Sequence, residues 1–86
     1  MSISSIKVKV LYFANVKEVA GIREEEFIIS NPASSDLLLR RIQEVHPGIK
    51  DLLKTITISV NCRVILDDVL LKDADEVALL PPVAGG

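Results

Sequence analysis

Apolar and polar residues alternate regularly along much of this chain of 86 residues, and the period of the alternation predicts its secondary structure. Residues 6–13 alternate with a period of two, which predicts a strand with one face in the core. The residues expected on that face are Ile6, Val8, Val10 and Tyr12. Residues 24–30 predict a second strand, antiparallel to the first. Between the two strands we expect one short helical turn, with Asn15 as its N-cap and Gly21 as its stop.

The longest helical pattern follows the second strand. Its capping oxygens are supplied by Ser34, Ser35 and Asp36. Its apolar face, at helical spacing, consists of Leu38, Leu39, Ile42 and Val45. Pro47 disfavours helical geometry at the residue before it and Gly48 allows a reversal, so the helix is expected to end near His46. Residues 49–53 predict a short packed turn.

Three further strands are expected after that turn. The clearest covers 56–62, where one face of the alternation is formed by Ile56, Ile58, Val60 and Cys62. Residues 63–66 predict a short strand, and 77–80 predict a final buried strand that ends at Pro81.

These elements predict an α+β fold of the ubiquitin-like β-grasp type, a mixed sheet of four to five strands packed over one main helix. The β-grasp domain is expected to cover residues 1–80, and residues 81–86 to form a flexible, extended C-terminal tail.

The composition excludes several classes of function. Lys and Arg total 10 against 12 Asp and Glu, so no basic excess is available to bind nucleic acid. No apolar run approaches the roughly 20 residues of a membrane-spanning helix, and residues 1–10 lack the features of an export signal. Cys62 is the only cysteine, which excludes an intramolecular disulfide and is typical of a reducing compartment. We therefore expect a cytosolic protein with no nucleic-acid or membrane partner.

The chemistry is expected in the tail, Pro-Pro-Val-Ala-Gly-Gly. Pro81 and Pro82 fix φ and predict an extended segment that leads away from the sheet. Gly85 and Gly86 have no Cβ, so they can enter a narrow channel and leave the terminal carboxyl accessible. A carboxylate is a poor electrophile until it is activated, and the chain has no glycine-rich phosphate loop, so activation must come from a partner. The alternative is that Gly-Gly is only a frayed terminus.

The chain resembles the small subunits of molybdopterin synthase over nearly its whole length. The resemblance rests on Lys-Val-Leu-Tyr-Phe-Ala at 9–14 with Glu18 and Gly21 after it, on His-Pro-Gly at 46–48, and most specifically on the close of the chain at 75–86. Family members often carry Ser or Thr where this chain has Ala84.

The resemblance implies a sulfur carrier that binds no cofactor directly and is not an enzyme by itself. An adenylyltransferase/sulfurtransferase of the ubiquitin-activating type would use ATP to convert the Gly86 carboxyl to an acyl-adenylate and then to a thiocarboxylate. The large synthase subunit, which would carry the catalytic residues in a heterotetramer, would accept the tail and deliver the sulfur to cyclic pyranopterin monophosphate during molybdenum cofactor biosynthesis. The residues expected to insert with Gly86 are Pro81, Pro82, Val83, Ala84 and Gly85.

A docking surface is expected beside the tail. If the first strand turns Tyr12 toward the helix, Leu11 and Phe13 point outward and share a face with Leu80. Contiguous exposed apolar residues often mark an interface, here for both the activating enzyme and the large subunit. The alternative is that the faces are inverted or covered by a loop.

Three other candidates are weaker. We expect Cys62 to pack in the core or at a strand end and not to relay sulfur. His46 is the only histidine and has no second ligand at metal spacing, so no metal site is predicted. The acidic residues that could pair with a basic partner, but are more simply solvated turns, are Asp67, Asp68, Asp73, Asp75 and Glu76.

Two alternative functions remain open. The first is another Gly-Gly carrier on the same fold, either a thiamine-type sulfur carrier or a ubiquitin-related modifier, although Pro-Pro before the tail disfavours both. The second is a β-grasp interaction module whose tail has no chemistry. A self-contained enzyme is disfavoured because no nucleophile and base are paired in the sequence.

Overall fold

The structure is a computed structural model that describes residues 5–81. Its elements follow in the order β1 (Ser5–Tyr12), α1 (Ala14–Ala20), β2 (Glu24–Ser30), β3 (Ala33–Ser34), α2 (Ser35–Val45), the 3₁₀ turns η1 (Pro47–Ile49) and η2 (Leu52–Lys54), β4 (Thr57–Val60), β5 (Arg63–Ile65), β6 (Leu70–Leu71) and β7 (Glu76–Leu80). No helix in this part of the chain is long and apolar enough to cross a membrane.

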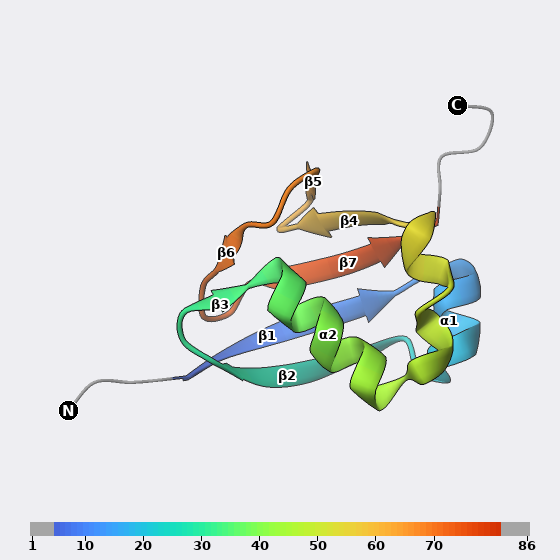
Figure 1. Cartoon of the computed structure of the whole chain (residues 1–86), viewed down its shortest axis with the longest axis horizontal. Coiled ribbons are helices and arrows are strands. Elements are labelled where there is room, and N and C mark those ends of the chain that lie inside the picture. Colours follow the sequence, from blue (N-terminus) through green and yellow to red (C-terminus); the bar gives the residue numbers. More distant parts are fainter. Residues whose placement is uncertain (1–4, 82–86) are drawn as a thin grey trace.

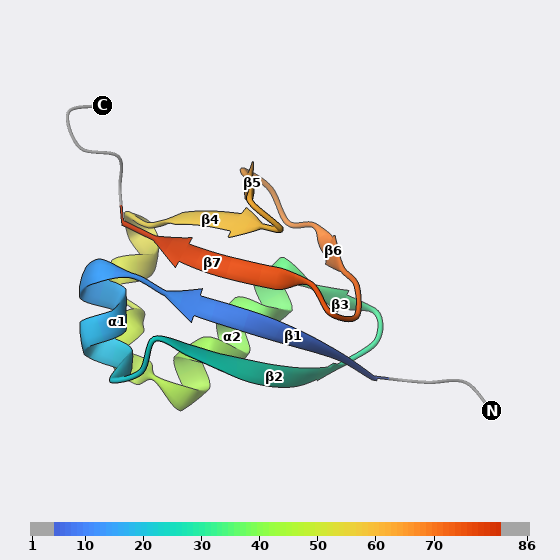
Figure 2. The same cartoon turned by 180° about the vertical axis from the view of Figure 1, so that it is seen from behind.

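Five of the strands form one mixed sheet in the order β2-β1-β7-β4-β5. β1 and β7 run parallel at its centre, and every other neighbouring pair is antiparallel. α2 crosses one face of this sheet (Figure 1), whereas no helix of residues 5–81 lies over the opposite face, which is seen from behind in Figure 2. β3 and β6 form a separate two-stranded sheet. The predicted ubiquitin-like β-grasp fold is confirmed.

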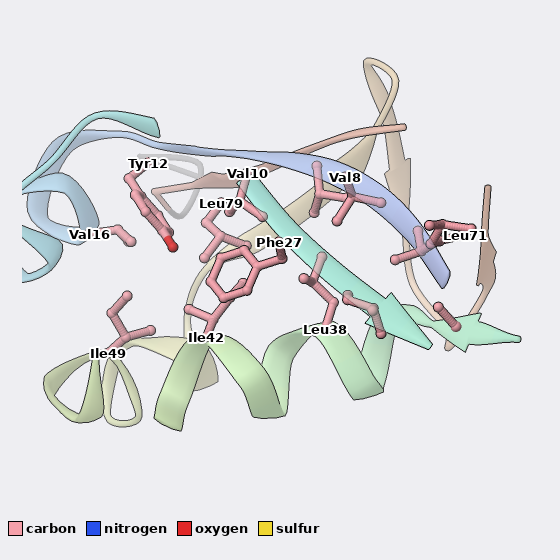
Figure 3. Close-up of a cluster of buried hydrophobic side chains, with 14 residues drawn as sticks. Val8, Val10, Tyr12, Val16, Phe27, Leu38, Ile42, Ile49, Leu71 and Leu79 are labelled. Atoms are coloured by element: carbon pink, nitrogen blue, oxygen red, sulfur yellow. The ribbon is translucent and has the colours of Figure 1, made fainter. Parts of the chain in front are cut away.

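The core lies between α2 and the covered face of the sheet. Figure 3 shows side chains of β1 and β2 directed toward Leu38 and Ile42 of α2, both of which are fully buried. The predicted inward face of β1 is confirmed, because each of its four residues is at most 7% exposed. Val16 of α1 and Ile49 of η1 close the core at the end of the sheet where β1 and β7 finish. Burial of these aliphatic side chains is the main stabilisation of the domain.

The two helices begin and end close to where the sequence predicts. Ser34 is confirmed as a cap of α2, since its side-chain oxygen accepts the N–H of Leu37. Gly21 is confirmed as the stop of α1, and its φ of 81° lies in the left-handed region. The prediction of Asn15 as N-cap is wrong, because the Phe13 carbonyl accepts the N–H groups of the first turn and α1 therefore starts at Ala14.

Two predicted core positions are also wrong. Val45 is 50% exposed, because the inward stripe of α2 continues from Leu38 and Ile42 with a spacing of four residues and reaches His46 instead. Cys62 is exposed, because β4 ends at Val60 and Cys62 lies in the following turn with a φ of 69°. The alternation that predicted a strand over 56–62 thus extends beyond the paired residues.

Candidate functional site

The candidate reactive group lies at the C-terminal end of β7. Pro81 is exposed and directly follows this strand, so the predicted end of the strand is confirmed. β7 lies between β1 and β4, and Leu80 pairs with Thr57 at the start of β4. α1 and the η1–η2 connection lie at the same end of the sheet (Figures 1 and 2). The predicted tail residues Pro82, Val83, Ala84, Gly85 and Gly86 lie outside the described residues.

The uncovered face of the sheet carries the residues that we predicted as a docking surface. Leu11 pairs with Ala78 across the parallel β1–β7 ladder, so these two residues and Leu80 point away from α2. Leu11 and Leu80 are half-buried. Phe13 is 42% exposed and lies one step beyond the pair formed by Tyr12 and Leu79. The predicted orientation of the strand faces is therefore confirmed, while docking itself remains a proposal.

The sequence did not predict two further residues of this surface, Ala78 and Val64. Ser59 of β4 pairs with Ala78 on one side and with Val64 of β5 on the other, which puts all three side chains on the uncovered face. Val64 is 58% exposed. The orientation of Val64 could have been predicted, because neighbouring residues of a strand point to opposite faces and Ile65 pairs with Ile58 on the face toward the core. We call Leu11, Phe13, Val64, Ala78 and Leu80 the outer patch.

Charged residues border the outer patch on one side. The part of the uncovered face formed by β1 and β2 carries two cross-strand ion pairs, Lys7 with Glu26 and Lys9 with Glu24, each at 3.8 Å. A hollow at the end of β1 brings Lys17 and Arg23 next to the apolar residues Leu11 and Phe13. On this face the ion pairs lie toward β2, next to the exposed Ile28, and the outer patch lies toward β5, so charged groups border the patch as in an interface with a polar rim.

The acidic residues have structural roles. Asp68 accepts hydrogen bonds from the Asp36 N–H at 2.8 Å and the Ser35 hydroxyl at 2.9 Å, and so holds the start of α2. The Asp36 N–H, followed by nearby hydroxyls, lowers the pKa of the Asp68 carboxyl. Asp73 accepts the Lys7 N–H, and Asp75 accepts the Lys72 N–H. Asp73 and Asp75 therefore order turns and Asp68 orders the start of α2, while pairing of the acidic residues with a basic partner stays a prediction.

His46 faces a carboxylate and not a metal site. Its Nε2 lies 2.5 Å from Oε2 of Glu25, which the sequence did not predict. Among residues 5–81, no group of three or more His, Cys, Asp or Glu side chains is placed to hold a metal ion.

Comparison with known proteins identifies the family. The model of the ThiS family matches residues 10–86, which is most of the chain. The chain belongs to the ThiS family. Among curated members of similar sequence, the molybdopterin synthase sulfur carrier subunit of Chlamydomonas reinhardtii is 40% identical over 83 residues, covering 94% of this chain and 100% of the relative. The human protein of the same name is 35% identical over 83 residues, covering 93% and 94%.

Solved structures of similar proteins support the same family. A putative molybdopterin converting factor subunit 1 from Pyrococcus furiosus superposes with a TM-score of 0.82 at 36% identity, covering 91% of this chain and 99% of that one. A chain in the complex of subunits 1 and 2 of the molybdopterin-converting factor from Helicobacter pylori superposes with a TM-score of 0.65 at 34% identity, covering 94% of this chain and 100% of that one. The small archaeal modifier protein 1 of Methanosarcina acetivorans gives 0.77 at 31% identity, covering 95% and 98%.

Proposed function

We propose that this chain is the sulfur carrier subunit of a molybdopterin synthase and that the terminal carboxyl of Gly86 carries the sulfur. The observation that supports this most directly is the 40% identity to a curated sulfur carrier subunit across that protein's full length. The family match that extends to residue 86 includes the Gly-Gly terminus in the similarity. The chain's single cysteine is compatible with work in the reducing cytosol.

The proposed chemistry takes place on partners. An activating enzyme joins one oxygen of the Gly86 carboxylate to the α-phosphorus of ATP, which releases pyrophosphate and leaves an acyl-adenylate. Hydrosulfide from the sulfur donor then attacks the carbonyl carbon and loses its proton, and AMP departs with that oxygen, so the product is a thiocarboxylate. Gly85 and Gly86 have no Cβ and leave the carbonyl open to this attack. ATP is thus a substrate of the partner, and this chain needs no cofactor of its own.

The outer patch is the proposed docking surface for both partners. It lies beside the point where the chain leaves β7, so a partner that covers the patch also receives the tail. The structure of a similar protein is that of a complex between subunits 1 and 2 of a molybdopterin-converting factor. We propose that this chain also binds a large subunit, and that the two form a heterotetramer in which the large subunit supplies the catalytic residues and two tails deliver sulfur to cyclic pyranopterin monophosphate.

Reconstitution with the large subunit tests the proposal. The chain is prepared with a Gly86 thiocarboxylate and mixed with large subunit and cyclic pyranopterin monophosphate, and dithiolene formation is followed together with loss of sulfur from Gly86. We expect product in proportion to the thiocarboxylate consumed, and none with the unmodified chain or with a chain lacking Gly86. Consumption of the thiocarboxylate without pterin product would assign the sulfur to a different acceptor.

A protein modifier is the second candidate, and the similarity to small archaeal modifier protein 1 favours it specifically. In that case the activated Gly86 carbonyl would be attacked by a lysine amine and would form an isopeptide bond. Because trypsin last cleaves this chain after Lys72, tryptic peptides that carry residues 73–86 on a lysine would reveal such conjugates. Their absence from cells that accumulate the Gly86 thiocarboxylate would exclude this function in favour of sulfur transfer.

A further inference from the structure

One polar cluster lies on the covered side of the sheet. Glu25 shares the inward face of β2 with Phe27, because β2 alternates between exposed and covered positions. Its Oε2 accepts a hydrogen bond from the hydroxyl of Tyr12 and lies 2.5 Å from Nε2 of His46. The Glu25 and His46 side chains are only 22% and 14% exposed. We call Tyr12, Glu25 and His46 the Glu25 cluster.

The geometry of the cluster fixes the roles of its hydrogen-bonding groups. With Glu25 as a carboxylate, which can only accept, the contact assigns a proton to Nε2 of His46. The rings of Tyr12 and His46 meet edge to face, with centroids 5.6 Å apart and planes at 83°. Burial, with the hydrogen bond to Glu25 and its charge, raises the pKa of the Tyr12 hydroxyl, so this group stays a donor at neutral pH. Both donors therefore depend on a single carboxylate oxygen.

The cluster joins segments that surround the end of β7. Tyr12 is the last residue of β1 and pairs with Leu79. His46 is the C-cap of α2, and its carbonyl accepts the N–H of Ile49, the residue that ends η1. Figures 1 and 2 show α1, η1 and η2 at this end of the sheet, and we call these three elements the exit frame.

The exit frame has few apolar anchors of its own. α1 and η1 each have one fully buried side chain, Val16 and Ile49, whereas η2 has none and only packs Leu52 and Leu53 partly buried against the core. η1 also packs closely on α1, because a Cβ on Gly48 would lie 2.9 Å from Cγ1 of Val19. Segments with so few fully buried side chains open locally more readily than the sheet, and polar contacts then help to hold them.

We propose that Glu25 is a positioning residue, which through Tyr12 and His46 holds the exit frame around the point where the reactive tail leaves the sheet. α1 starts directly after Phe13 of the outer patch, so the cluster also fixes the part of the docking surface next to the tail. This role rests on the proposed function only where it concerns partner binding, because the positioning itself is a property of the free chain.

Amide hydrogen exchange on the free chain tests the positioning role. In Glu25→Ala, both donors lose their acceptor, and we expect the Gly21 and Ile49 amides to exchange about tenfold faster. The Leu37 and Val69 amides donate hydrogen bonds to Ser34 and Ser35 at the other end of α2. Their exchange reports openings that do not involve the cluster, so their exchange rates should not change. Equal acceleration at both ends, or no acceleration at Gly21 and Ile49, would overturn the proposal.

Two controls separate the hydrogen bonds from packing and charge. Glu26→Ala removes the neighbouring exposed carboxylate of the same strand, which has only a long ion pair with Lys7, and should leave exchange unchanged. His46→Ala should accelerate exchange, while His46→Gln, which retains an N–H donor, should restore most of the protection. The ¹⁵N spectrum of this single histidine should show a proton on Nε2 at neutral pH; a proton on Nδ1 alone would contradict the cluster.

The functional consequence is measured separately, as the affinity of Glu25→Ala for the large subunit. We expect binding about tenfold weaker than that of the original chain, while Glu44→Ala, which removes an exposed carboxylate of α2 on the opposite side of the sheet, should bind normally. Unchanged affinity of Glu25→Ala would refute the role in docking. If the original chain itself fails to bind, the proposed function fails, and the exchange data still decide the positioning role.

Discussion

Phe13 of the outer patch allows the docking proposal to be tested quantitatively. Phe13 is 42% exposed, and its backbone carbonyl, which Phe13→Ala retains, accepts the N–H groups that start α1. A phenylalanine can bury roughly 200 Å² in total, so about 80 Å² is left for a partner to cover. At about 25 cal/mol per Å², this area is equivalent to about 2 kcal/mol. Phe13→Ala should therefore weaken partner binding by about 30-fold.

Isothermal titration calorimetry against the large subunit, and against the activating enzyme, measures this loss. Ile28→Ala is the matched control, because Ile28 is 63% exposed on the same face of the sheet but pairs with Lys7, outside the patch. Its affinity should equal that of the original chain. If Phe13→Ala binds normally, or if Ile28→Ala is equally weakened, the outer patch is not the docking surface. Thermal melts of both variants verify that the fold is retained.

Three further predictions concern the stability of the domain. Tyr12, the only tyrosine, has a raised pKa when folded, so stability should fall above its unfolded value of about 10 by about 1.4 kcal/mol per pH unit, and Tyr12→Phe should remove this slope in alkaline urea titrations. The pKa of Asp68 is lowered in the folded domain, so this carboxylate stabilises the fold above its ordinary pKa of about 3.9. That stabilisation is lost as the pH falls through the lowered pKa. Asp68→Ala should therefore melt below the original chain at neutral pH, with the difference shrinking in acid; a difference that is constant with pH would contradict this. Gly48→Ala should lower the free energy of unfolding by about 1–3 kcal/mol, because the added Cβ would lie against Val19. Val19→Ala in the same chain should restore most of this loss, as measured by chemical denaturation.

The sequence predicts the larger elements because each repeats its pattern several times. The alternation in β1 has four inward residues, and all are buried. The same parity places Leu11 on the uncovered face, where it meets Leu80 once β1 and β7 pair. The alternation along each strand, together with the pairing of β1 and β7, is therefore sufficient to predict most of the outer patch.

Short elements and turns were not predictable in this way. β3 and β6 have two residues each, too few for any period, and exist because Ala33 and Leu71 meet across the fold. The alternation continued through Cys62, but Asn61 and Cys62 have φ values of 50° and 69°, which end the strand at Val60. Asn61 belongs to a residue type that adopts positive φ readily, so it carried a partial signal for the turn, whereas Cys62 carried none.

The Glu25 cluster shows a different limit. Period two along β2 turns Glu25 inward, and a spacing of four residues from Leu38 and Ile42 turns His46 inward, so both orientations were available from the sequence. Their meeting was not, because 21 residues separate them and the contact depends on how α2 crosses the sheet. Tertiary packing alone brings these two side chains together with Tyr12.

The mass of the C-terminal peptide tests the central claim most directly. The chain is incubated with its activating enzyme, ATP and a sulfur donor, and its intact mass and the mass of the peptide that contains Gly86 are measured. We predict a gain equal to the exchange of one oxygen for one sulfur, confined to that peptide, dependent on ATP and absent when Gly86 is deleted. An unchanged mass with an enzyme that demonstrably forms the acyl-adenylate would contradict the assignment of this chain as a sulfur carrier.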